Sequence, residues 1–218
     1  MKIMAIELTD LDEYFCKKYA NYDKLCLLPG YQMPKMQDSK IGEDGLTYTY
    51  TLPVETMSLA NQKNKAEVLQ ALKQRLFDQT FSFSFSVQSW WRRFTNLFRK
   101  HTSQKVIRGI LKKHGISIAE AGAGLEIPEE VWKGICKGTF LPTKNTVLSF
   151  ALTAHLTAED ADELFEVCEY EWDYTLVKDT VLSYLLQNRI YNEEIIRKAL
   201  EEYNVENLFI RYTDEKNA

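Results

Sequence analysis

Hydrophobic and polar positions follow two different periods in the first part of the chain. Apolar residues at helical spacing predict a helix over residues 10–19 and another over residues 64–78. Residues 47–52 instead alternate and are rich in strand-forming residues, which predicts a strand that Pro53 ends or places at a sheet edge. Residues 34–45 are polar and contain two glycines, so we expect them to form a loop.

The clearest two-residue period lies in residues 80–87. We expect serines on one face of this strand and large apolar side chains on the other, and the apolar face consists of Phe81, Phe83, Phe85 and Val87. Because an exposed face of this kind would promote aggregation, another element is expected to cover it. Together these elements predict that residues 1–87 form a small α+β module.

The second half of the chain has helical spacing throughout. A first helix is expected to end at Gly115, and Ser117 is a suitable N-cap for the second. A third helix is expected to begin near Pro128 and to close at Gly138. A fourth, apolar helix should end near residue 156.

Further helices follow these four. Thr157 begins a capping-box pattern for a fifth helix, and two more helices are expected over residues 173–187 and 192–203. The short apolar stretch 205–211 is expected to pack back as a strand or turn. The pattern therefore predicts an all-α domain over residues 104–211 and a frayed tail over residues 212–218.

The order and spacing of the first five of these helices, over about residues 104–170, resemble the lambda-repressor/XRE helix-turn-helix family. The resemblance rests on a small residue in the second helix, an apolar residue at the turn, a glycine after the third helix and a Pro-Thr pair before an apolar fourth helix: Ala119 or Ala121, Ile127, Gly138, Pro142-Thr143, and Val147, Leu148, Phe150 and Ala151. A longer match to about residue 208 is similar to the helical tail found after ADP-ribose-binding macro domains and other signalling domains in some bacterial proteins. The sequence contains no macro-domain motif, so no ADP-ribose chemistry is implied.

The resemblance implies a DNA-reading surface, because the N-terminal half of the third helix faces the major groove in this fold. Here Glu129 and Glu130 begin that helix, and residues 129–137 contain no Arg, Gln or Asn. Carboxylates that face phosphates oppose binding, so we favour a protein-interaction or structural use of the fold over DNA binding. In the DNA-binding alternative, the contacting residues would be Arg108, Lys112, Lys113, Lys133, Lys137 and Lys144.

Charge is strongly segregated along the 218 residues, whose formal net charge is −4. Residues 79–119 carry eight Lys and Arg and no acidic residue, whereas residues 120–218 carry nine Lys and Arg and 20 Asp and Glu. Within the basic block, residues 88–103 predict a connecting amphipathic helix with large aromatic side chains. Its candidate interaction residues are Trp90, Trp91, Arg92, Arg93, Phe94, Phe98, Arg99 and Lys100.

This basic aromatic helix has several interpretations. The favoured one is that its aromatic face packs as core between the two halves of the chain, with its cations against the acidic C-terminal block. Alternatively, the helix could lie on an anionic membrane surface, dock in an acidic hydrophobic groove of another protein, or bind a nucleic-acid backbone.

The sequence carries no constellation typical of catalysis or of metal binding. Its four cysteines form no CxxC pair, its three histidines do not stand at zinc-ligand spacing with cysteine, and residues 122–124 lack the preceding strand of a phosphate loop. We therefore expect no enzyme activity, no metal and no cofactor. The N-terminus has no signal-peptide apolar region and no run is long enough to span a membrane, so we expect a soluble cytoplasmic protein.

These patterns lead to one functional hypothesis and two alternatives. The hypothesis is a non-catalytic regulatory or adaptor protein that uses a helix-turn-helix-like fold to bind a protein partner. The first alternative is a DNA-binding transcriptional regulator of XRE type. The second is a peripheral membrane adaptor that acts through the basic aromatic helix. The sequence leaves open the identity of the partner and the oligomeric state.

Overall fold

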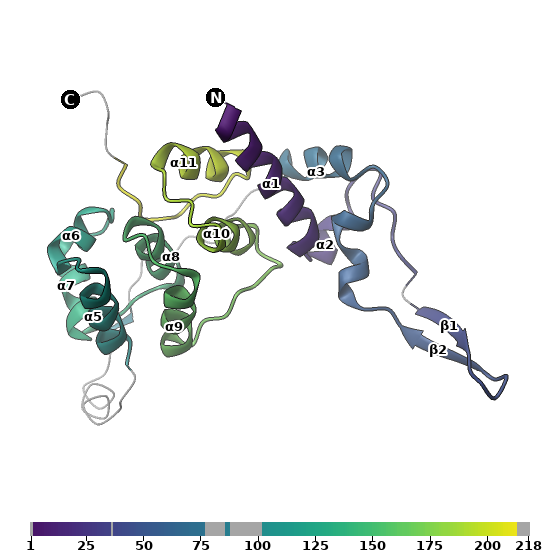
Figure 1. Ribbon diagram of the computed structural model, residues 1–218, viewed down its shortest axis with the longest axis horizontal. Coiled ribbons are helices and arrows are strands. Elements are labelled where there is room, and N and C mark those ends of the chain that lie inside the picture. The colour runs from purple at the N-terminus through teal and green to yellow at the C-terminus, as the bar shows by residue number, and fades with distance from the viewer. Residues whose placement is uncertain (1, 36, 77–85, 88–101, 213–218) are drawn as a thin grey trace.

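The structure is a computed structural model that describes residues 2–35, 37–76, 86–87 and 102–212. Within these residues the chain combines many helices with a few short antiparallel strands, which confirms the α+β class (Figure 1). Outside the described residues lie most of the expected strand over 80–87, including Phe81, Phe83 and Phe85, and most of the expected connecting helix, over residues 88–101.

The N-terminal part contains helices, two 3-10 turns and one β-hairpin: α1 (Lys2–Lys18), α2 (Tyr22–Leu25), β1 (Gln37–Ile41), β2 (Thr47–Thr51), η1 (Val54–Met57), η2 (Leu59–Asn61) and α3 (Lys65–Lys73). The strand predicted over residues 47–52 is confirmed as β2, and the two predicted helices correspond to α1 and α3. The loop predicted over residues 34–45 is wrong in part, because this stretch contains β1. Its polar sequence hid the strand, since both faces of β1 are exposed and no apolar alternation is needed.

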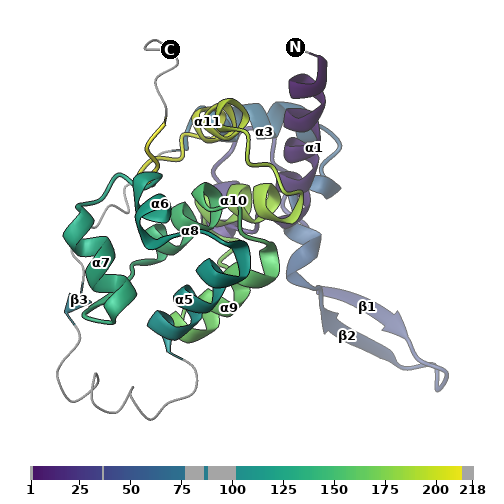
Figure 2. The same ribbon diagram turned by 60° about the vertical axis from the view of Figure 1, so that its left-hand side comes forward.

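The hairpin projects from the helical body (Figures 1 and 2). Its strands pair antiparallel, with Ser39 opposite Thr49 at the centre of the register. Every residue of both strands is exposed, so neither face of the hairpin covers a core.

The C-terminal part contains seven helices among the described residues: α5 (Ser103–His114), α6 (Ile118–Ala123), α7 (Glu129–Lys137), α8 (Lys144–Thr153), α9 (Ala158–Cys168), α10 (Val177–Gln187) and α11 (Glu193–Glu202). These confirm the predicted helices, with α10 starting later than expected. Gly115 and Gly138 end α5 and α7 in the left-handed region, with φ of 69° and 73°. Capping boxes at Ser117 and Thr157 start α6 and α9 as predicted.

A second, two-residue antiparallel pair joins β3 (Ser86–Val87) to β4 (Phe140–Leu141), just after α7. Val87 was expected on a buried strand face, but its side chain is 69% exposed. This expectation is therefore wrong for Val87. In the described part of the chain β3 pairs with β4 through its backbone, and no element packs against the Val87 side chain.

The N-terminal and C-terminal helices share one hydrophobic core. Helix α10 lies at its centre, with all residues from 177 to 186 buried, and α1 packs against it. The ring of Phe15 in α1 lies 4.5 Å from that of Tyr203, which follows α11. The buried Lys73 of α3 binds Asp12 of α1 at 2.7 Å and Glu202 of α11 at 2.9 Å. Helices α1 and α3 thus pack the N-terminal part onto the C-terminal helices.

None of the described helices is long and apolar enough to cross a lipid bilayer.

Candidate functional site

Within the described part of the chain, a groove between α6 and α7 is a candidate site, and local capping positions both helices. The Ser117 side chain accepts a hydrogen bond from the Glu120 backbone N–H at 3.1 Å, and the Glu120 carboxylate accepts one from the Ser117 N–H at 2.7 Å. Pro128 precedes α7, and its fixed φ suits a helix start. The carboxylates of Glu129 and Glu130 then lie at the positive end of the helix dipole.

Trp132 joins the two helices closely. Its side chain is buried, and its indole Nε1 donates a hydrogen bond to the Ile118 carbonyl at 2.7 Å. A Cβ atom at Gly122 would lie 2.6 Å from Cδ1 of Trp132, so only glycine leaves room for the ring there. The small residue expected in the second helix was Ala119 or Ala121. Ala121 is buried and Ala119 is exposed, while Gly122 makes the tightest approach.

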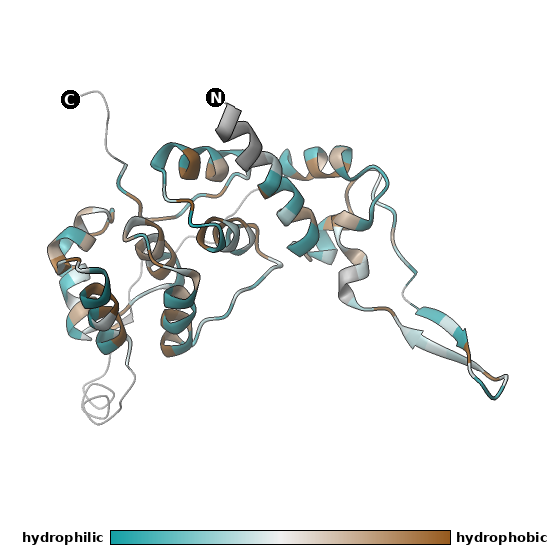
Figure 3. Cartoon of the chain, in the orientation of Figure 1, coloured by the Kyte–Doolittle hydropathy of each residue, from teal (hydrophilic) through white to brown (hydrophobic). Residues whose placement is uncertain are grey.

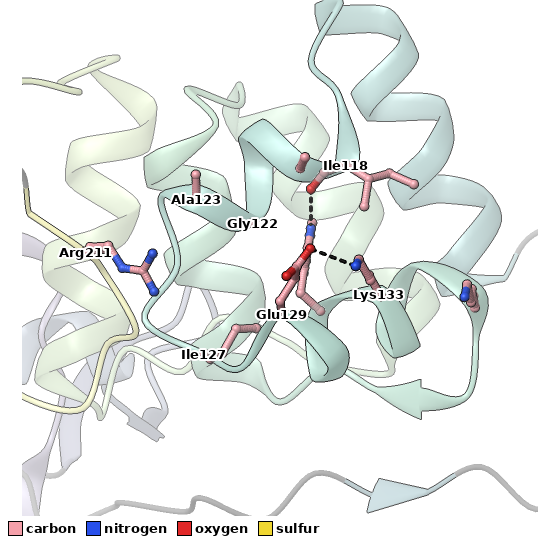
Figure 4. A pocket seen from close by; sticks show the side chains of 10 residues that line it. Ile118, Gly122, Ala123, Ile127, Glu129, Lys133 and Arg211 are labelled. Carbon is pink, nitrogen blue, oxygen red and sulfur yellow. Dashed lines mark hydrogen bonds and ion pairs between the residues drawn. The ribbon is translucent and has the colours of Figure 1, made fainter.

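The groove has a cavity volume of about 620 Å³ and a largely apolar floor (Figure 4). Ile118 stands on its wall, and 37% of the residue is exposed. The floor is completed by the small and apolar residues Ala119, Gly122, Ala123, Ile127 and Trp132. A volume of this size lies in the range of ligand pockets.

The C-terminal segment adds one wall to the groove. Residues 205–211 return to the turn between α6 and α7, as predicted for this apolar stretch, and the Glu126 N–H donates to the Phe209 carbonyl at 2.8 Å. The Arg211 N–H donates to the Gly124 carbonyl at 3.0 Å. This pairing brings the Arg211 side chain to the groove from a position distant in the sequence (Figure 4).

Charged residues form the rim. Lys133 binds Glu129 one turn earlier in α7 at 2.7 Å, and this hydrogen bond lowers the pKa of the exposed Glu129 carboxyl. Lys137 and Arg211 also reach the rim, and neither forms an ion pair with another described residue. The rim therefore presents one neutralised pair and two cations.

The six DNA-contact candidates have different surroundings. Lys133 and Lys137 lie on the groove. The Arg108 guanidinium donates to the Cys136 carbonyl at 2.9 Å, which ties α5 to the end of α7. Lys112 is exposed on α5.

Lys113 and Lys144, the other two candidates, are engaged within the fold. Lys113 binds Asp160 at 2.7 Å. Lys144 forms an ion pair with Asp179 and donates to the Glu171 carbonyl at 2.6 Å. Both carboxylates are almost completely buried, so each needs its lysine as a counter-charge. The structure assigns these two lysines to holding α9 and α10 in place.

The Asp160 carboxylate accepts hydrogen bonds from Lys113, His114 and Thr157. Burial alone would raise the pKa of Asp160, but these hydrogen bonds outweigh it and lower the pKa to about 2. The cluster joins the end of α5 to the start of α9 and lies on neither helix of the groove.

The candidate interaction residues of the basic aromatic helix lie outside the described residues. They are Trp90, Trp91, Arg92, Arg93, Phe94, Phe98, Arg99 and Lys100. The interpretations of this helix therefore stay predictions.

A cysteine and a histidine, residue types that often act in catalysis, are engaged in packing within the fold. Cys136 is buried, and burial raises the pKa of its thiol to about 11, which disfavours the nucleophilic thiolate. The His155 ring stacks on Tyr191 with 4.8 Å between centroids. Among the described residues, no group of three or more His, Cys, Asp or Glu side chains is placed to hold a metal ion.

Sequence reasoning did not single out four residues that line the groove: Ile118, Gly122, Ala123 and Arg211. Gly122 carried a signal, because a glycine inside a helical pattern often has a packing reason. Arg211 carried none, since only the tertiary pairing of its segment with the α6–α7 turn brings it there.

Comparison of the chain with protein-family models, with curated proteins and with solved structures finds no match. Functional inference therefore depends on the groove, its rim and the surrounding charges.

Proposed function

We propose that this protein is a non-catalytic regulatory or adaptor protein that binds a protein partner in the α6–α7 groove. In this proposal helices α5 to α9 form a helix-turn-helix domain similar to the lambda-repressor/XRE family, extended by α10 and α11. The N-terminal α+β module precedes this domain along the chain.

One observation carries the proposal: the surface that would read DNA is hollow and apolar. A DNA-reading helix presents polar side chains that reach base edges, with cations toward the phosphates. Here the exposed first turn of α7 presents Glu129 and Glu130, and the groove beside it is lined by Ile118 and Ile127. Apolar grooves between helices are typical docking sites for apolar side chains of a partner protein.

The surrounding charges also favour a protein over DNA. Helices α6 and α7 and the turn between them carry four carboxylates against two lysines: Glu120, Glu126, Glu129 and Glu130 against Lys133 and Lys137. Since DNA affinity depends on neutralising several phosphates, a surface with this balance lacks the usual electrostatic attraction.

A photo-crosslinking residue at position 118 tests the proposal in the native cell. We expect a discrete adduct with one protein, and none from the same crosslinker at the exposed Glu163 of α9. Ala119→Arg should fill the groove without disturbing the core and weaken the interaction at least about tenfold. Adducts that persist unchanged with Ala119→Arg would overturn the groove as the docking site.

The alternative of DNA binding has one observation in its favour, the presence of Lys137 and Arg211 on the same rim. Purified protein should show no binding to mixed duplex DNA at low salt. Binding with a steep salt dependence that is lost in Lys112→Glu/Lys137→Glu would favour the DNA alternative instead. These two lysines are the appropriate choice, because substitution of Lys113 would also disturb Asp160.

A further inference from the structure

The β1–β2 hairpin is a surface that the proposed function does not use. It projects from the helices, and both of its faces are exposed along their whole length (Figures 1 and 2). Tyr48 and Tyr50 are 53% and 46% exposed. Isolated two-stranded hairpins are marginally stable in water, and exposed strand edges offer unpaired backbone groups to another strand.

The register shows which backbone groups of β2 point outward. The Gly42 N–H donates to the Leu46 carbonyl at 2.8 Å, and Gly42 stands opposite Leu46 in the continuation of the register. Hydrogen-bonded and non-hydrogen-bonded pairs alternate along an antiparallel ladder. Tyr48 and Tyr50 therefore bond toward β1, and the backbone N–H and C=O groups of three residues point to the free edge: Thr47, Thr49 and Thr51.

The two edges of the hairpin differ in charge. Strand β1 contains Asp38 and Lys40, and charged residues of this kind are a common protection against edge-to-edge pairing. Strand β2 contains only threonine and tyrosine, both strong strand formers. Figure 3 shows the contrast, with β1 mostly hydrophilic and β2 of intermediate hydropathy. The β2 edge is the unprotected one.

The sequence of β2, Thr-Tyr-Thr-Tyr-Thr, reads the same in both directions about Thr49. We propose that β2 pairs antiparallel with β2 of a second copy of this chain, about a two-fold axis through Thr49, to form a four-stranded sheet in the order β1-β2-β2-β1. A two-fold interface of this kind uses the same surface on both copies.

In this arrangement each residue of β2 lies opposite a residue of the same type in the second copy. Thr49 meets Thr49 of the second copy, and Thr47 meets Thr51, so the outward backbone groups of both strands pair. Tyr48 meets Tyr50 of the second copy on the opposite face, and aromatic pairs and Thr–Thr pairs are favourable cross-strand neighbours. A strand from an unrelated protein would need to reproduce this pattern, whereas a second copy supplies it by symmetry.

The test compares substitutions at two residues that face each other across the hairpin. Thr49→Lys places two lysines directly opposite at the two-fold axis, and Ser39→Lys places the same charge on the outer edge of β1. Sedimentation of the full chain over a concentration series should show a monomer–dimer equilibrium. We expect Thr49→Lys to weaken it at least about tenfold and Ser39→Lys to leave it nearly unchanged. Far-ultraviolet circular dichroism checks that both variants remain folded.

Cysteine substitution provides a second measurement that does not depend on weakening the dimer. Hydrogen-bonded residues opposite each other have Cα atoms about 5.5 Å apart, a distance that a disulfide can span. Thr49→Cys should therefore form a covalent dimer under mild oxidation, whereas Ser39→Cys and the wild-type chain, with its own four cysteines, should not.

A chain that stays monomeric at all concentrations, or a dimer that tolerates Thr49→Lys, would overturn the proposal. A complex with a different protein through β2 would also overturn it, because the second copy would then not be the occupant. These results leave the groove between α6 and α7 untouched, since the hairpin and the groove share no residue.

Discussion

Trp132 connects the packing of α7 with the shape of the groove. Its ring lies 5.1 Å from that of Phe150 in the core, while its Nε1 bonds to the Ile118 carbonyl at the groove wall. The side chain that anchors the helix thus also forms the apolar floor. A substitution here would change stability and binding together, so it is a poor test of binding.

Asp160 is a better residue for testing how the domain is held together, because its effect depends on pH. The carboxyl has a pKa of about 2 in the folded chain, against about 3.9 in an unfolded one. Since the folded pKa is the lower one, the stabilisation is complete above about pH 4 and disappears as the pH falls through 2. It amounts to about 2 kcal/mol.

We predict that Asp160→Asn lowers the free energy of unfolding by about 2 kcal/mol at neutral pH and flattens its dependence on pH between about 4 and 2. Urea unfolding followed by circular dichroism at several pH values measures both effects. Glu163→Gln, an exposed neighbour on α9, is the control and should change little. An unchanged pH slope in Asp160→Asn would contradict the assignment of this carboxylate.

At the scale of the element, glycine has opposite roles in two neighbouring helices. Gly109 in α5 faces open space, whereas Gly122 in α6 faces the Trp132 ring. Alanine has a higher helix propensity than glycine by about 1 kcal/mol. Propensity alone would therefore predict that both substitutions stabilise the protein.

We predict instead that Gly109→Ala raises the free energy of unfolding by about 0.5–1 kcal/mol, while Gly122→Ala lowers it by about 1–3 kcal/mol through overpacking against the ring. Thermal and urea unfolding of the two variants provide the comparison. Equal effects would mean that α6 and Trp132 are less closely packed than the 2.6 Å approach indicates.

The elements that could be predicted from sequence are those with local signals. Helices α5 to α9 carry their own caps, such as Ser117 and Gly138, so their ends could be located without tertiary information. Strand β1 could not be located, because an exposed hairpin imposes no apolar period on its residues. The groove was missed for a related reason, since its wall at Arg211 depends on a tertiary contact that no local pattern encodes.

At the scale of the whole molecule, the sequence correctly predicts which residues form the apolar face of a helix. It does not identify the element against which that face packs. The boundary between residues 1–87 and 104–211 is predicted where the mixture of strand and helix patterns gives way to helical spacing alone. The structure packs Phe15 against Tyr203 across that boundary and buries Lys73 between helices from both sides. We therefore expect the two parts to unfold together.

All four tryptophans follow residue 87, and Trp132 and Trp172 lie in the C-terminal part of the chain, so the fluorescence comes from tryptophans outside the N-terminal part. We predict that Phe15→Ala in α1 destabilises the protein by about 3–5 kcal/mol and shifts the fluorescence and circular dichroism transitions to the same lower urea concentration. A fluorescence transition that stays in place would show that the parts unfold independently. Leu27→Ala, at an exposed side chain of the same region, serves as the control.

The return of residues 205–211 to the α6–α7 turn has a consequence for synthesis of the chain. A ribosome delivers Glu126 long before Phe209, so the nascent helices α6 and α7 emerge without the strand-like segment that pairs with their turn. During that interval the apolar floor lacks one wall and is open to chaperones or to premature partners. The order of translation thus delays assembly of the complete groove until α8 to α11 have been made, which couples completion of its shape to the folding of the whole C-terminal part.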